Sequence, residues 1–125
     1  MYKVSVKGNF VAKHFLIGGD WGRESQMHSH DYQVEVQLEG ATLDRHGYLV
    51  DIVDIKAHLG SLLDYFRNGT LNEMREFEGL NPSLEHFARI FCQTLSSRIE
   101  APHLSALTVK LWEDESAWAA YRQER

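Results

Sequence analysis

The sequence predicts an α+β fold in which two helices cover one face of a small antiparallel sheet. Apolar and polar residues alternate over residues 2–7 and 32–39, and again over 107–112, as in strands that bury one face. In the middle of the chain the apolar residues are instead spaced by three and four, as on one side of a helix. Because the first two strands follow one another without a helix between them, we expect them to pair in the antiparallel sense.

Length and composition bound the class of protein. At 125 residues the chain is expected to form one domain, residues 1–125, whose core needs no disulfide. Cys92 is the only cysteine, which excludes an internal disulfide and favours a reducing compartment, so we expect a cytoplasmic protein. A net charge of −5 argues against nucleic acid or an anionic membrane as the partner, and no apolar run is long enough to span a membrane.

The first helix is expected to carry its apolar residues from Ile52 to Phe66. Asp51 or Asp54 suits its N-terminal end, where a carboxylate accepts hydrogen bonds from free backbone N–H groups. Asn68 and Gly69 adopt left-handed conformations readily, so the helix should stop beside them.

The second helix is expected to start with Asn81 as its N-cap and Pro82 in its first turn, and to end before Pro102. Cys92 falls on the apolar side of this helix, which predicts a buried thiol rather than a nucleophile. The last segment, residues 117–122, is compatible with either an extended or a helical conformation.

Three histidines are expected to meet at one end of the sheet. If the second strand begins at His28, then His28 and His30 share the side of its apolar residues, because side chains two apart in a strand point the same way. A glycine-rich loop joins this strand to the first, near whose end lies His14. Three neutral imidazoles with an open fourth position form the ligand set of a catalytic zinc ion.

Two carboxylates are candidates for chemistry beside this site. Glu24 lies in the loop four residues before His28, where it can act as a general base or remain a solvated loop residue. Glu113 follows the strand over residues 107–111 on the side of its apolar residues. There it can accept two parallel N–H bonds from the guanidine-like edge of a pterin or guanine, or remain an exposed charge.

A cupin is an alternative interpretation of the His-x-His motif. Gly22, His28, His30 and Glu35 match most of a cupin's first metal motif, which would predict iron or manganese in a jelly roll. A jelly roll needs about eight strands, whereas two helical segments occupy the middle of this chain. Glu35 also has the opposite parity to the two histidines, so it should point away from them.

Six segments spread over nearly the whole chain carry a resemblance to a known family. They are Phe10–His14, His28–Tyr32, Gly47–Lys56, Leu71–Asn72, Asn81–Glu85 and Glu113. In this order they resemble the 6-pyruvoyltetrahydropterin synthase and 6-carboxytetrahydropterin synthase family.

The resemblance implies a T-fold, a four-stranded antiparallel sheet with two helices on one side. Such subunits assemble through a barrel into trimers and usually hexamers, with active sites at subunit interfaces. The resemblance also implies zinc on His14, His28 and His30, a pterin held by Glu113, and Ser83 near the pocket. Members of the family convert 7,8-dihydroneopterin triphosphate, with zinc polarising its side-chain hydroxyls while an acid/base pair moves protons.

The sequence departs from the family pattern at two places. The usual catalytic cysteine, four residues before the first histidine of the His-x-His motif, is Glu24 here. The usual Asp-His pair falls on Arg67–Asn68 without a gap, and only a gap that the spacing disfavours would offer Asp64–Tyr65.

A subgroup that resembles this family carries glutamate at the cysteine position and is linked to side-chain cleavage that yields 6-hydroxymethyl-7,8-dihydropterin. We therefore predict Glu24 as the catalytic residue of a zinc-dependent lyase. A pterin- or purine-binding homologue that has lost synthase activity is the alternative.

Overall fold

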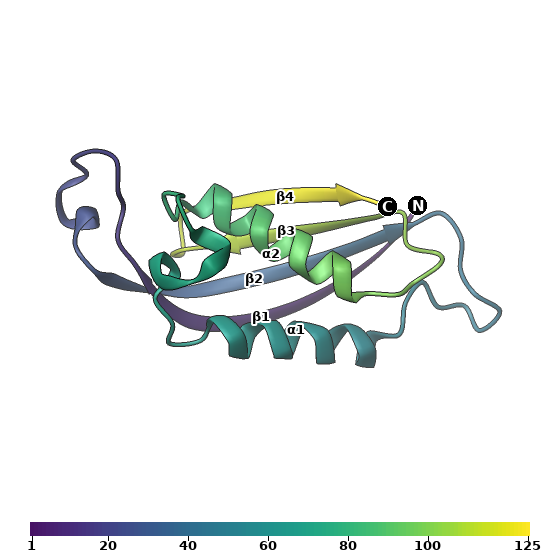
Figure 1. Ribbon diagram of the computed structural model, residues 1–125. Coiled ribbons are helices and arrows are strands. Elements are labelled where there is room, and N and C mark those ends of the chain that lie inside the picture. Colours follow the sequence, from purple (N-terminus) through teal and green to yellow (C-terminus); the bar gives the residue numbers. More distant parts are fainter.

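A computed structural model describes all residues, 1–125, and shows a four-stranded antiparallel sheet with both helices on one face (Figure 1). The strands lie in the order of the sequence, β1-β2-β3-β4. Their bounds are Tyr2–His14 for β1, His28–Gly40 for β2, Ala106–Trp112 for β3 and Trp118–Glu124 for β4. The helices are α1, Ile52–Phe66, and α2, Leu84–Arg98; short 3-10 turns are η1, Gly22–Ser25, η2, Leu71–Glu73, and η3, Arg75–Phe77. The predicted α+β class is confirmed, and a jelly roll is excluded.

The register of the sheet leaves one end of β2 without a second neighbour. β1 pairs with β2 along its whole length, from Tyr2 opposite Gly40 to His14 opposite His28. β3 pairs with β2 only from Gln33 onward. The first residues of β2 are therefore flanked by a strand on one side alone, and this end of the sheet is open to other side chains.

The core lies between the sheet and the helices. Even-numbered residues of β1 and β2 face the helices and are mostly buried, as the alternation predicts. Phe10 lies at the centre of the core, with its ring centroid 5.2 Å from that of Tyr32 and 5.8 Å from that of Phe87. Cys92 is buried on α2 among these apolar side chains, which confirms the prediction of a core thiol.

Helix α1 begins and ends where the sequence predicted, after Asp51 and before Asn68. Asp51 is its N-cap and accepts a hydrogen bond from the Val53 N–H over 3.0 Å. The chain leaves the helix through Asn68, whose φ of 59° is the left-handed conformation that asparagine tolerates.

The predicted start of α2 is wrong by two residues. Asn81 is not the N-cap and Pro82 is not helical; Ser83 caps the helix, its Oγ accepting the His86 N–H over 3.1 Å. The side chain of Asn81 is engaged elsewhere, since its Oδ1 accepts the N–H of Ile17 over 2.8 Å.

Residues 117–122, for which the sequence allowed either an extended or a helical conformation, belong to β4. None of the helices has the length and apolar character needed to cross a membrane.

Candidate active site

The three predicted histidines converge where β1 ends and β2 begins. His14 pairs directly with His28 across the two strands, and His30 follows on the same face of β2. One nitrogen from each ring lies within 4.8 Å of the other two. The cluster depends both on the alternation of side chains along each strand and on the register in which β1 pairs with β2. A shift of one residue in either would turn a histidine to the opposite face of the sheet.

Backbone carbonyls orient two of the rings. The Nδ1 atom of His14 lies 2.9 Å from the carbonyl oxygen of Pro82, and that of His28 lies 2.7 Å from the carbonyl oxygen of Gln26. A carbonyl oxygen only accepts, so each Nδ1 carries a proton and each Nε2 offers a lone pair. This is the arrangement in which histidine binds a metal ion through Nε2.

The Nε2 atom of His14 is buried and has no hydrogen-bond partner among the protein atoms. A buried polar atom without a partner is costly, and a cation beside it would satisfy it. Burial lowers the pKa of His14 from 6.5 to about 4, so its ring is neutral at pH 7, as a ligand must be. The Nε2 atoms of His28 and His30 are 3.1 Å apart. Two nitrogens bound tetrahedrally to one zinc lie roughly 3.3 Å apart, so this pair has the spacing of two ligands of one metal ion.

Glu113 stands beside the histidines at the end of β3. Its Oε2 lies 4.0 Å from the Nε2 of His30, and its side chain is 25% exposed. Burial raises the pKa of Glu113, and the nearby carboxylates of Glu24, Asp114 and Glu85 raise it further, while His30 opposes them. Glu113 is therefore partly buried next to the histidines, and its role in holding a pterin stays a prediction.

A cavity of about 390 Å³ brings the other predicted residues to the same place. Glu24, Ser83 and Glu113 line it together with His14. The hydroxyl of Ser83 already accepts a bond as the N-cap of α2, so its position is fixed by the helix start. Sequence reasoning missed further lining residues, among them Trp21, Asn81, Glu85 and Trp118. Glu85 carried a usable signal, because it belongs to Asn81–Glu85, one of the segments that carry the family resemblance.

The loop that carries Glu24 is tied to the end of β1. Glu24 belongs to the turn η1, and its carbonyl oxygen accepts the N–H of Leu16 over 2.8 Å. Gly18 and Gly22, with φ of 85° and 63°, turn the chain on either side of Trp21. The side chain of Glu24 is exposed within the single chain and lines the mouth of the cavity.

The positions where the family has its Asp-His pair lie outside this cavity. Asn68 donates its N–H to the carbonyl oxygen of Val11 over 2.6 Å, on the outer side of β1. The guanidinium of Arg67 lies 3.5 Å from the carboxylate of Asp64, and Tyr65 donates its hydroxyl to Glu76 over 2.7 Å. Neither pair of residues reaches the histidines of its own chain.

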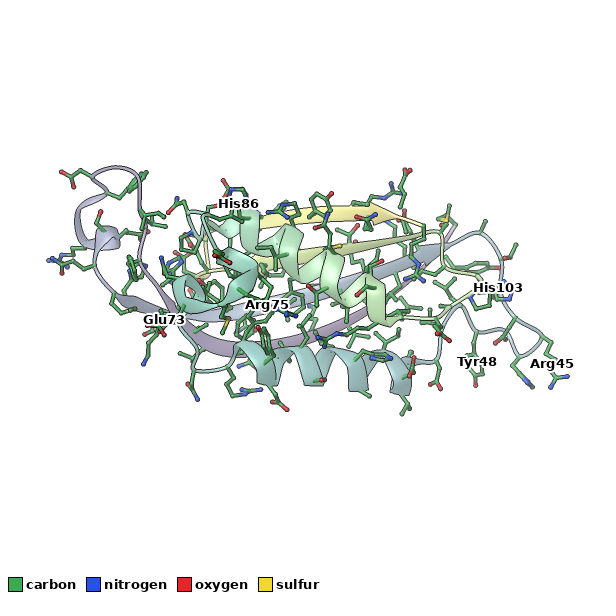
Figure 2. All side chains as sticks on the ribbon, viewed as in Figure 1. Arg45, Tyr48, Glu73, Arg75, His86 and His103 are labelled. Carbon is green, nitrogen blue, oxygen red and sulfur yellow. The ribbon has the colours of Figure 1, made fainter.

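The remaining histidines lie apart from the cluster. His103 is at the opposite end of the sheet, where its Nδ1 is 3.0 Å from the Thr42 hydroxyl, and His86 is on α2 beside Arg89 (Figure 2). His58 is on α1 next to Asp54. The only group of histidine, cysteine and acidic side chains arranged to hold a metal ion is the one formed by His14, His28 and His30.

A family model described as 6-pyruvoyl tetrahydropterin synthase matches residues 3–124, so the chain belongs to this family. No curated protein matches the sequence.

Solved structures share the fold at low sequence identity. The 6-pyruvoyl tetrahydropterin synthase of Caenorhabditis elegans has a TM-score of 0.83 and 21% identity, over 98% of this chain and 96% of that chain. The Plasmodium vivax 6-pyruvoyltetrahydropterin synthase, in a variant whose catalytic glutamate is replaced by alanine, has a TM-score of 0.82 and 15% identity, over 99% and 98%. A dihydroneopterin aldolase from Burkholderia thailendensis, bound to guanine, has a TM-score of 0.55 and 8% identity, over 99% and 91%.

Proposed function

We propose that this protein is a zinc-dependent lyase that acts on 7,8-dihydroneopterin triphosphate or a related pterin and cleaves its side chain to 6-hydroxymethyl-7,8-dihydropterin. The observation that supports this proposal is that His14, Glu24 and Glu113 line one cavity. A metal ligand, an acid/base group and a carboxylate suited to a guanidine-like edge are the three parts that such a reaction needs.

Zinc is the metal that suits the donors best. Three imidazole nitrogens with no thiolate leave one position open for substrate, as in catalytic zinc sites. When bound there, zinc supplies a Lewis acid that makes a nearby substrate hydroxyl more acidic.

Glu113 is proposed to hold the pterin ring. Its two carboxylate oxygens can accept N–H bonds from the ring's 2-amino group and the adjacent ring nitrogen, a paired arrangement stronger than two neutral hydrogen bonds. Partial burial reduces the access of water to this contact, and the 4.0 Å distance to His30 would keep the ring beside the metal ligands. The aldolase of similar fold was solved with guanine, which carries the same amino-oxo edge.

Glu24 is proposed to move the proton. Its carboxylate takes the proton of the 2′-hydroxyl, and the C1′–C2′ bond breaks. The electron pair of that bond passes to C1′ and the conjugated pterin ring, while C2′ becomes the carbonyl carbon of the departing aldehyde. The protonated carboxyl then returns the proton to C1′, so one residue takes and gives it without the usual Asp-His pair. The catalytic glutamate of the P. vivax protein supports a carboxylate in this role.

We further propose that the chain assembles through its sheet edges into trimers or hexamers with a barrel. β1 and β4 are edge strands in the single chain, and proteins pair or cover such edges. Trp118, 54% exposed at the start of β4, would gain cover from a neighbouring subunit and lies at the cavity wall.

A second candidate function is pterin or purine binding without turnover. It is favoured by Arg67 and Asn68, which stand where the family has Asp-His and cannot replace that pair as acid and base.

One assay separates these two functions. Zinc-loaded protein is incubated with 7,8-dihydroneopterin triphosphate, and the pterins are separated and identified by mass. Release of 6-hydroxymethyl-7,8-dihydropterin is expected. Tight pterin binding with no product, at full zinc occupancy, would replace the lyase proposal with the binding function.

A further inference from the structure

The short segment from His14 to Ile17 connects the metal ligand to the loop that carries Glu24. β1 ends at His14, so the peptide groups of residues 15–17 have no partner strand and must find other partners. The N–H of Leu16 donates to the carbonyl oxygen of Glu24, as described above. The position of Glu24 therefore depends on where this segment lies.

The side chain of Asn72 forms paired hydrogen bonds with Phe15. Its Oδ1 accepts the Phe15 N–H over 3.0 Å, and its Nδ2 donates to the Phe15 carbonyl oxygen over 2.9 Å. On the other side of His14, the N–H of Lys13 donates to the carbonyl oxygen of Gly69 over 2.8 Å. The backbone on both sides of His14 is thus hydrogen-bonded to residues 69–72. Among side chains, only an amide offers both the N–H donor and the carbonyl acceptor that a peptide group has.

The side chain of Asn81 holds the other end of the segment. Its Oδ1 accepts the N–H of Ile17 over 2.8 Å, next to the Leu16 peptide that binds the Glu24 carbonyl. Asn81 also lines the cavity with Glu24, so it lies near the chemistry without belonging to the metal cluster.

We propose that Asn72 and Asn81 are positioning residues with separate tasks. Asn72 fixes the backbone on which the metal ligand His14 stands, and Asn81 fixes the backbone to which Glu24 is tied. The first task depends only on the histidine cluster, whereas the second rests on the function proposed above for Glu24.

Metal affinity tests the first task. Metal-free variants are titrated with Co²⁺, and binding is followed by calorimetry and by the visible absorption of tetrahedral cobalt. Asn72→Ala is expected to bind about 10–100-fold more weakly, the usual loss when a group that orients a ligand is removed. Asn81→Ala and the control Asn9→Ala, an exposed asparagine within β1, should bind as the wild type does.

Amide hydrogen exchange of the metal-free protein, followed by NMR, tests the separation of the two tasks. Asn81→Ala should accelerate exchange at Ile17 and Leu16 but not at Phe15, and Asn72→Ala should do the reverse. Asn81→Asp keeps the accepting oxygen and should restore protection at Ile17. If Asn72→Ala does not fold, Asn72→Leu, which has a similar shape but neither donor nor acceptor for Phe15, provides the same comparison.

In the turnover assay, Asn81→Ala should lower kcat more than it changes KM, since it displaces Glu24 rather than the pterin site. If both alanine variants weaken Co²⁺ equally, or if all three amides exchange faster in each, the separate tasks are wrong and the asparagines only stabilise the fold. If the wild type turns over no pterin, the proposed function fails, while the cobalt and exchange results still decide the role of Asn72.

Discussion

The Nε2 atom of His28 lies 3.1 Å from the Nε2 atom of His30. A direct hydrogen bond between them needs a proton on one of the two nitrogens, whereas a shared metal ion needs a lone pair on both. The Gln26 carbonyl, 2.7 Å from Nδ1 of His28, keeps the proton on that side of the ring. Nε2 of His28 thus offers a lone pair, and with Nε2 of His30 also unprotonated the pair can share a cation with His14, which leads to the first prediction.

Replacing His28 with alanine should abolish stoichiometric zinc binding. Loss of an orienting partner alone weakens metal binding about 10–100-fold, so loss of a ligand should cost more. Zinc content after dialysis, by elemental analysis, and affinity, by calorimetry, are the measurements. The control is His58→Ala, because His58 lies on α1 beside Asp54 alone. Equal zinc content in both variants would show that the cluster is not the metal site.

Metal-free protein should lose stability as the pH falls below about 6.5. Burial lowers the pKa of His14 from 6.5 to about 4, so between these values the unfolded state binds more protons than the folded state. Stability then falls as the pH falls, by up to about 3 kcal/mol for a shift of this size. Urea unfolding at pH 7 and pH 4.5 measures the difference. In His14→Leu this pH dependence should shrink, and an unchanged dependence would assign it to other groups.

Glu24→Gln should remove turnover but keep the metal. A positioned general acid/base contributes about 10²–10⁴-fold to the rate, and an amide cannot take up the proton. The measurements are kcat on the pterin substrate and zinc content of the same preparation. Glu73→Gln, an exposed glutamate in η2, serves as the matched control. An unchanged kcat in Glu24→Gln would show that Glu24 is not the acid/base residue.

Glu113→Gln should weaken pterin binding. Hydrogen bonds to a charged group contribute about 1.5–3 kcal/mol, which corresponds to roughly a 10–100-fold rise in Kd. Fluorescence titration of the zinc-loaded protein with a non-reacting pterin measures this. The neighbouring Glu115 is exposed, so Glu115→Gln should bind as the wild type does. Equal affinity in both variants would place the pterin edge elsewhere.

Cys92 should be unreactive in the folded protein. Burial raises the pKa of its thiol to about 11, and its Sγ lies 3.5 Å from the carbonyl oxygen of Leu107. Reagents attack the thiolate, so a thiol-specific reagent at pH 8 should label no cysteine in native protein and one per chain in urea. Rapid labelling of folded protein would contradict a core position.

Alternation predicted β1, β2 and β3 because each buries one face, and the three-and-four spacing predicted both helices. Alternation did not predict β4, which has no buried residue in the single chain. The start of α2 could not be predicted, since Asn81, Pro82 and Ser83 each suit a helix start. A residue far away in the chain decides it. The Asn81 side chain accepts the N–H of Ile17, so Ser83 is the residue that caps α2.

The sequence by itself determined the α+β class, the side of the sheet on which His28 and His30 lie, and the burial of Cys92. Those properties follow from local spacing, which one strand or helix contains. Only the tertiary structure decided that His14 pairs with His28, that Glu113 comes within 4.0 Å of His30, and that Glu24 and Ser83 line one cavity with His14. These relationships depend on strand register and on contacts between residues far apart in the chain, which local spacing does not specify.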